Sequence, residues 1–108
     1  MANKKLISLV AACYNESANL EELYNRVVSV FEDIRYDFEL ILVDNKSTDN
    51  SEKIYEQLVK RDFRVRVIFM TRNFGGPQPS YFAGMKEARG DAVVLLDGDL
   101  QDPPELIA

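Results

Sequence analysis

Four short apolar runs recur along the chain and alternate with segments whose apolar residues repeat at helical spacing. The runs are continuous and rich in Val, Ile and Leu, and they cover residues 6–12, 38–43, 65–70 and 92–96. Continuous apolar runs of this length are typical of strands in a parallel sheet that is covered on both faces. The pattern therefore predicts four buried parallel strands.

The segments between the first three runs predict two amphipathic helices. Apolar residues at helical spacing place the first helix at about 20–33, and Asn19 with Glu22 three residues later forms a potential capping box. The second helix would be opened by Thr48 or Asp49 as its cap.

Two further helices are predicted in the second half of the chain. A shorter helix is expected around 81–88, with Gly90 as its C-terminal stop. Pro103 and Pro104 suit the first turn of another helix, inside which the chain stops at Ala108. We therefore expect residues 1–108 to be the N-terminal part of a larger protein.

Alternation of strands and helices predicts the fold class. Right-handed crossovers between parallel strands give a Rossmann-like α/β open sheet with helices on both faces. The chain has 108 residues, 46% of them hydrophobic, which suits one compact domain.

Composition narrows the possible functions. The net charge is −5 and there is no run of basic residues, which argues against binding to nucleic acid. The chain contains no histidine and only one cysteine, Cys13. This excludes a disulfide framework, a Cys/His zinc site and a His-activated nucleophile within the chain. No spanning segment or signal peptide is evident, so we expect a soluble cytoplasmic domain.

Polar residues follow each of the four predicted strands. Ligands of open α/β sheets bind beyond the carboxyl ends of the strands. Each cluster alone fits an ordinary turn, but their coincidence on one edge favours a binding site. The clusters are Tyr14-Asn15-Glu16, residues 44–49, residues 71–76 and Asp97-Gly98-Asp99.

The two carboxylates after the fourth strand indicate a metal-bridged phosphate site. Asp97 and Asp99 would repel each other unless a cation joined them. Oxygen ligands select Mg²⁺ or Mn²⁺, and a diphosphate could complete the coordination. Two solvated turn carboxylates remain the alternative. Neither G-x-G-x-x-G nor a P-loop sequence is present, so pyridine-dinucleotide and P-loop enzymes lose support.

Taken together, these segments resemble the glycosyltransferase family 2 pattern, particularly in the dolichol-phosphate mannosyltransferase and bacterial polyprenyl-phosphate glycosyltransferase branch. The resemblance covers essentially the whole chain, and its most specific segment is LDGDLQDPPE at 96–105. The other matching segments are Tyr14-Asn15-Glu16-Ser17, Leu42-Val43-Asp44 with Ser47-Thr48-Asp49, Arg72-Asn73-Phe74-Gly75, and Ala83-Gly84 with Ala88-Arg89-Gly90-Asp91.

The resemblance implies a glycosyltransferase-A fold and a set of nucleotide-binding residues. Tyr14 and Glu16, with Asn15 between them, would line the nucleoside site, and Asp44 would face the base. Arg72 would lie near the nucleotide. For Tyr14, stacking on the base and plain packing remain equal alternatives.

The resemblance also assigns the catalytic metal site. Asp97 would approach the ribose or diphosphate, Asp99 would coordinate Mg²⁺ or Mn²⁺, and Gln101 would assist there. The implied reaction is one in-line displacement at the anomeric carbon of a nucleotide sugar such as GDP-mannose or UDP-glucose. It inverts the configuration and releases a nucleoside diphosphate.

A polyprenyl-phosphate acceptor would explain the missing histidine. Its phosphate has a second pKa of about 6 and needs no general base near neutral pH. We expect acceptor-side residues after the segment seen here and work at the inner face of the cytoplasmic membrane. The alternatives are a saccharide acceptor in polysaccharide synthesis, a non-catalytic nucleotide-sugar-binding or scaffold domain, and a hydrolase or nucleotidyltransferase. The residues do not determine the donor sugar, the base or the oligomeric state.

Three residues depart from the family pattern. Ala12 stands where proline is usual, and Asn45-Lys46 replaces a common Asp-Gly. Without that glycine, a positive φ at Lys46 would be costlier. For Phe74, Phe82 and Met85 we expect core packing.

Overall fold

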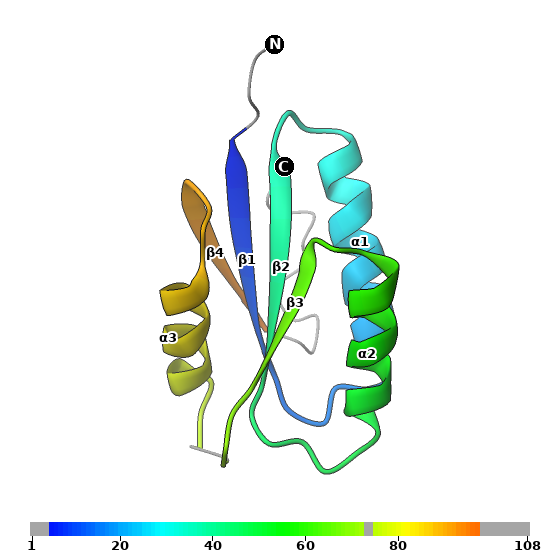
Figure 1. The fold of residues 1–108 in the computed structure, drawn as a ribbon, viewed down its shortest axis with the longest axis vertical. Coiled ribbons are helices and arrows are strands. Elements are labelled where there is room, and N and C mark those ends of the chain that lie inside the picture. The colour runs from blue at the N-terminus through cyan, green and yellow to red at the C-terminus, as the bar shows by residue number, and fades with distance from the viewer. Residues whose placement is uncertain (1–4, 73–74, 98–108) are drawn as a thin grey trace.

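A computed structural model of the chain describes residues 5–72 and 75–97. Its strands are β1 (Leu6–Cys13), β2 (Asp37–Asp44), β3 (Val65–Phe69) and β4 (Ala92–Asp97). All pairings between them are parallel, and the order across the sheet is β3-β2-β1-β4 (Figure 1). The four predicted strands are therefore confirmed, with every boundary within one residue of the prediction.

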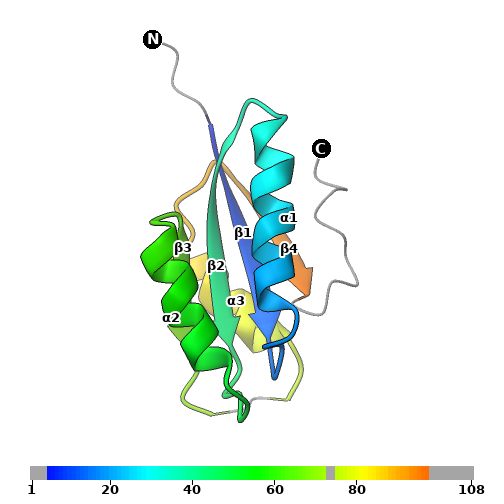
Figure 2. The ribbon, with the colours of Figure 1, turned by 90° about the vertical axis from the view of Figure 1, so that its right-hand side faces the viewer.

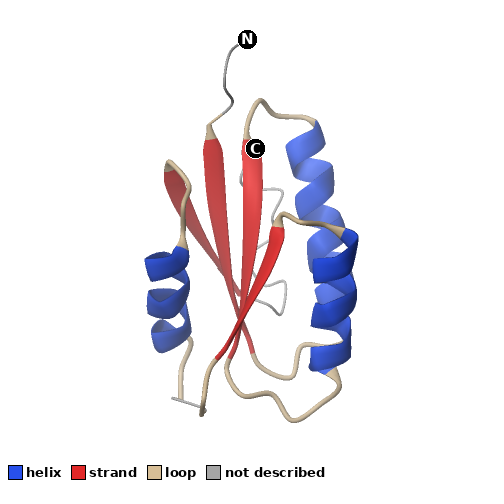
Figure 3. Cartoon of the chain, viewed as in Figure 1, coloured by secondary structure: helices blue, strands red, loops and turns tan. Residues whose placement is uncertain are grey.

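Three helices connect the strands and cover both faces of the sheet. They are α1 (Leu20–Glu32), α2 (Ser51–Arg61) and α3 (Gln78–Glu87). Figures 2 and 3 show α1 and α2 side by side on one face and α3 on the other. This arrangement confirms the doubly wound α/β architecture. Within the described ranges, no helix combines the length and apolarity needed to cross a membrane.

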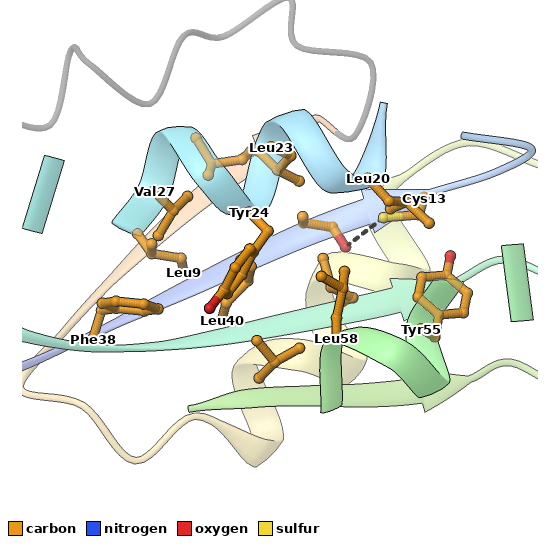
Figure 4. Packing of buried hydrophobic residues seen from close by; sticks show 14 of the residues in the cluster. Leu9, Cys13, Leu20, Leu23, Tyr24, Val27, Phe38, Leu40, Tyr55 and Leu58 are labelled. Carbon is orange, nitrogen blue, oxygen red and sulfur yellow. Dashed lines mark hydrogen bonds between the residues drawn. The ribbon is translucent and has the colours of Figure 1, made fainter. Parts of the chain in front are cut away.

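The larger core lies between the sheet and the α1–α2 layer. Leu9 and Leu40 point from the central strands toward Leu23, Val27 and Leu58 of the two helices (Figure 4). These five side chains have no exposed surface. Burying a Leu or Val side chain contributes about 1.5–3 kcal/mol, so this layer accounts for much of the apolar driving force.

The smaller core lies under α3 and depends on close approach of the helix. Gly84 faces Val10 and Val43, and a Cβ at this glycine would collide with Val10. The expected core packing of Phe82 and Met85 is wrong, since they are 63% and 44% exposed. The helix approaches the sheet most closely at Ser80 and Gly84, while Phe82 and Met85 lie on its outer side. Phe74 lies outside the described residues.

The predicted N-cap residue of α1, Asn19, is confirmed, but its capping hydrogen bond is absent. Its Nδ2 instead donates to Glu16 Oε2 at 3.0 Å. The carboxylate in the preceding loop therefore binds the amide that was expected to cap the helix.

The cap of α2 differs from the prediction in detail. Asn50 rather than Thr48 or Asp49 is the N-cap residue, and its side chain makes no capping hydrogen bond. Asp49 nevertheless accepts a hydrogen bond from the Ser51 N–H at 3.0 Å. An acidic side chain at the positive end of the helix was thus expected correctly, one residue outside the N-cap.

Helix α3 begins earlier than its apolar pattern suggests, at Gln78 rather than Tyr81, and Pro79 occupies the first turn. It ends at Glu87, so Gly90 is not its stop. A Cβ at Gly90 would collide with Ser8 and the Leu6 carbonyl, so this glycine permits close contact with β1. The helix predicted at Pro103–Pro104 lies outside the described residues.

A buried carboxylate joins the sheet to the segment after α3. Glu39 of β2 is 4% exposed and accepts hydrogen bonds from the Ser8 hydroxyl, Arg66 Nη1 and the Arg89 N–H. Burial alone would raise the pKa of Glu39, but these hydrogen bonds outweigh it and lower the pKa. The charged cluster therefore fixes three strands and the entry to β4 together.

Candidate nucleotide-binding edge of the sheet

The carboxyl ends of the parallel strands meet at one edge of the molecule, the lower edge in Figure 1. Two backbone hydrogen bonds continue the pairing past the strands. The Asn45 N–H donates to the Cys13 carbonyl at 2.8 Å, and the Met70 N–H donates to the Asp44 carbonyl at 2.9 Å. The starts of the loops after β1, β2 and β3 are therefore tied to one another by backbone hydrogen bonds.

Asp44, the predicted base-facing residue, has its carboxylate bound within the β2–α2 loop. It is 5% exposed and accepts hydrogen bonds from the Ser47 N–H at 2.8 Å, the Ser47 hydroxyl and the Tyr55 hydroxyl at 2.7 Å. Burial is the main cause that raises the pKa of Tyr55, and the hydrogen bond to the Asp44 carboxylate raises it further. Tyr55 therefore remains a neutral donor to Asp44.

Tyr55 was not among the sequence candidates, and Ser47 belonged to the cluster 44–49 but was given no role of its own. Ser47 had a detectable signal, because a serine three residues after an aspartate commonly closes a side-chain turn. Tyr55 had none, since it belongs to the apolar face of α2 and reaches Asp44 only through the helix packing shown in Figure 4.

Asn15 lies between the β1–α1 and β2–α2 loops. Its φ is 52°, and its side-chain oxygen accepts hydrogen bonds from the Thr48 N–H at 2.8 Å and the Asp49 N–H at 3.2 Å. Its own N–H donates to Ser47 Oγ at 2.9 Å. The structure thus brings Asn15 to the predicted site, with its side-chain oxygen directed at the neighbouring loop.

Tyr14 and Glu16, on either side of Asn15, differ in their surroundings. Tyr14 is 44% exposed, and Glu16 accepts the hydrogen bond from Asn19 that holds the turn before α1. An exposed aromatic ring at the end of a strand can stack on a nucleobase. Of these two side chains, Tyr14 has the larger surface open to a ligand.

Asp49 adds a second connection between the loops. Its Oδ2 accepts a hydrogen bond from the Ser17 N–H at 3.2 Å, while its Oδ1 accepts one from the Ser51 N–H. Desolvation opposes ionisation, but the hydrogen bonds from Ser51 and Ser17 lower the pKa of Asp49 overall. The carboxylate therefore holds both α2 and the β1–α1 loop as an anion.

Beside these loops lies a cavity of about 140 Å³, lined partly by Asp44, Lys46 and Phe69. Lys46, which stands where the family pattern commonly has glycine, has a positive φ of 62°. Pockets for small molecules usually measure about 300–1,000 Å³. At this edge the described residues alone therefore do not enclose a pocket of that size.

The predicted metal ligands lie at or beyond the end of β4. Asp97 is the last residue of this strand, and its backbone pairs with Ala12 of β1, next to the β1–α1 loop. Asp99 and Gln101 lie outside the described residues. No group of three potential metal ligands occurs within the described ranges. Arg72 is exposed just after β3.

Comparison with known proteins identifies the family. The family model for glycosyl transferase family 2 matches residues 8–108. The chain belongs to glycosyltransferase family 2. Its structure is similar to that of S. aureus TarS 1-349 in complex with UDP, with a TM-score of 0.75 and 28% identity. The match covers 86% of this chain and 27% of the TarS 1-349 chain. The fold is therefore of the glycosyltransferase-A type, as expected from the sequence.

Two curated relatives within the family are close in sequence. The undecaprenyl-phosphate 4-deoxy-4-formamido-L-arabinose transferase of Pseudomonas fluorescens is 39% identical over 102 residues, which cover 94% of this chain and 30% of that protein. The uncharacterized glycosyltransferase YkcC of Bacillus subtilis is 42% identical over 100 residues, which cover 93% of this chain and 31% of that protein. The chain thus spans about a third of the length of these relatives.

A mannosyltransferase from Pyrobaculum calidifontis, determined with GDP-Man and Mn²⁺, has the same fold. The TM-score is 0.75 at 19% identity, and the match covers 94% of this chain and 34% of the other. Structural similarity at this identity shows a shared fold.

Proposed function

We propose that this chain is the nucleotide-sugar-binding part of an inverting glycosyltransferase that transfers a sugar to polyprenyl phosphate. The observation that carries the proposal is the 39% identity over 102 residues to an undecaprenyl-phosphate sugar transferase. The arrangement of the carboxyl-terminal sheet edge supports it, because Tyr14 and the two connected loops lie where open α/β sheets bind ligands.

In this proposal the donor lies across the ends of β1, β2 and β4. Tyr14 stacks on the base, and Asp44 and Glu16 shape the nucleoside site through the loops that they hold. Asp97 is the last residue of the strand that pairs directly with β1, so its backbone is close to the β1–α1 loop. Arg72, after β3, contributes positive charge near the nucleotide.

The proposed metal is Mg²⁺ or Mn²⁺, held by Asp97, Asp99 and Gln101. Carboxylate and amide oxygens suit these hard cations. When bound, the metal supplies charge neutralisation on the departing diphosphate. The donor set of the sequence fits such an ion, since the chain offers many carboxylates and no histidine.

An acceptor that is already an anion fits the composition of the chain. A phosphate monoester is largely ionised near neutral pH and can attack without a histidine base. Because a polyprenyl chain resides in a membrane, we infer that the whole protein works at the inner face of the cytoplasmic membrane.

Calorimetric titration of UDP-glucose and GDP-mannose into the chain, with and without Mn²⁺, tests the proposal. We expect one donor to bind only with metal and Asp99→Asn to weaken that binding by at least about tenfold, a typical loss for a charged hydrogen-bonding or metal-binding partner.

Asp33→Asn is the matched control. It makes the same change at an exposed residue after α1, at the opposite end of the sheet, and should retain wild-type affinity. Equal donor affinity in wild type and Asp99→Asn would contradict the metal site. No binding of either donor by a folded chain would favour the scaffold alternative.

A further inference from the structure

The two loops at the proposed donor site are joined mainly through one side chain. Asn15 in the β1–α1 loop accepts hydrogen bonds from the backbone N–H groups of Thr48 and Asp49 in the β2–α2 loop, at 2.8 and 3.2 Å. The separation in sequence is more than thirty residues, so this contact exists only in the folded chain.

The chemistry of these contacts fixes the orientation of the Asn15 amide. Both partners are backbone N–H donors, so the atom facing them must be the oxygen. The N–H group of Asn15 itself donates to Ser47 Oγ, which adds a third connection to the same loop. Neither N–H of the side-chain amide takes part in these three hydrogen bonds.

The backbone at position 15 sets a second requirement. A φ of 52° lies in the left-handed region, where asparagine, aspartate and glycine are tolerated better than other residues. Only asparagine and aspartate combine this tolerance with a short side-chain acceptor. The position therefore requires both an unusual backbone conformation and an oxygen that can bridge to the next loop.

We propose that Asn15 is a positioning residue of the donor site, which holds the β2–α2 loop against the β1–α1 loop and thereby sets Tyr14 relative to Asp44. This inference rests on the proposed function and deepens it, because it assigns Asn15 to the loops rather than to direct contact with the nucleotide. Ser47 donates a hydrogen bond to Asp44, and its hydroxyl accepts one from the Asn15 N–H. Hydrogen bonds therefore connect Asn15 in the β1–α1 loop to Asp44 at the end of β2.

The first test measures hydrogen exchange at the backbone amides that donate to Asn15. In ¹⁵N-labelled chain, Asn15→Gly should accelerate hydrogen exchange at the Thr48 and Asp49 amides by about tenfold, the effect of losing one typical hydrogen bond. Glycine accepts the positive φ, so backbone strain does not confuse the result. Amides within β1 and β2 should keep their wild-type protection.

Two further variants make the test specific. Asn15→Asp retains an acceptor and should keep amide protection within about threefold of wild type. Asn50→Gly makes the same chemical change in the β2–α2 loop, at an exposed residue whose side chain makes no capping hydrogen bond, and should leave both amides protected.

Nucleotide affinity is then measured on the same proteins with UDP and GDP in the presence of Mn²⁺. Asn15→Gly should lose about tenfold in affinity, while Asn15→Asp and Asn50→Gly should stay within about threefold. Unchanged amide exchange in Asn15→Gly would overturn the connection between the loops. Lost protection with unchanged affinity would overturn its role in donor binding.

Asn15→Asp separates positioning from direct contact. If this variant keeps the amides protected but loses the nucleotide, the amide N–H₂ contacts the ligand and the positioning role is wrong. Failure of wild type to bind any nucleotide would overturn the proposed function and the donor-site role together. The exchange rates would still report whether Asn15 joins the loops.

Discussion

At the scale of single residues, two positions in neighbouring loops adopt left-handed backbone conformations, and they do so at different cost. Asn15 is a residue type that tolerates this region, and its side chain bridges the loops. Lys46 has a φ of 62° with an ordinary Cβ. An L-residue other than glycine, asparagine or aspartate loses roughly 1–2 kcal/mol in this conformation.

We therefore expect Lys46→Gly to stabilise the chain by about 1 kcal/mol, measured as the free energy of unfolding in urea. Glycine removes the clash of the Cβ, although its more flexible unfolded chain offsets part of the gain. Lys46→Ala is the control, because it removes the charge and keeps the Cβ. Equal stabilisation by both variants would show that charge, not backbone strain, limits this loop.

At the scale of elements, Asp62 joins α1, the end of α2 and the start of β3. It is 6% exposed, accepts a hydrogen bond from the Tyr24 hydroxyl at 2.8 Å and pairs with Arg64 at 2.8 Å. The hydrogen bonds from Arg64 are the main cause that lowers the pKa of Asp62 from its ordinary value of 3.8 to about 2.

This shift gives a pH prediction with a definite sign. A carboxyl whose pKa is lower in the folded than in the unfolded state contributes stability above the unfolded value. The contribution is lost as the pH falls from about 4 to about 2, and a shift of this size corresponds to about 2 kcal/mol. In urea unfolding, Asp62→Asn should be less stable by about that amount at neutral pH, and the gap should close across this window. Asp33→Asn should follow wild type, and a pH-independent gap for Asp62→Asn would contradict the assignment.

The elements also show how far the sequence alone was informative. Apolar periodicity located all four strands and placed α1 within one residue, because these elements bury continuous or regularly spaced Val, Ile and Leu side chains. It placed α3 less well, since that helix packs on the sheet through Ser80 and Gly84, whose small size gives no hydrophobic signal.

The candidate site was predictable in position but not in its internal contacts. Parallel strands guaranteed that residues after each strand would share one edge. The sequence does not show that Asn15 accepts a hydrogen bond from Thr48, or that Asp44 accepts one from Ser47. Such contacts depend on how the loops fold and meet. Glu39 is a charged residue within an apolar strand, and its place there is explained by the hydrogen bonds that it accepts from Ser8, Arg66 and Arg89 in the folded chain.

At the scale of the whole molecule, the described residues enclose little volume at the proposed donor site. The cavity beside the β2–α2 loop measures about 140 Å³, which is smaller than a typical small-molecule pocket. Leu95 of β4 and Phe82 of α3 are 42% and 63% exposed, so apolar surface also remains open on β4 and α3. Transfer requires the donor and the acceptor to be held together in a near-attack geometry.

We therefore expect this 108-residue chain to bind nucleotide sugar with metal but to transfer no sugar to undecaprenyl phosphate, because every group assigned to chemistry here lies on the donor side. The measurement is incorporation of labelled sugar from UDP-glucose or GDP-mannose into lipid. The same preparation is titrated by calorimetry, so an inactive but folded chain is distinguished from a misfolded one. Asp99→Asn is the blank for metal-dependent incorporation. Incorporation above that blank would show that about a third of a relative's length suffices for catalysis, and would move the acceptor site onto residues of this chain.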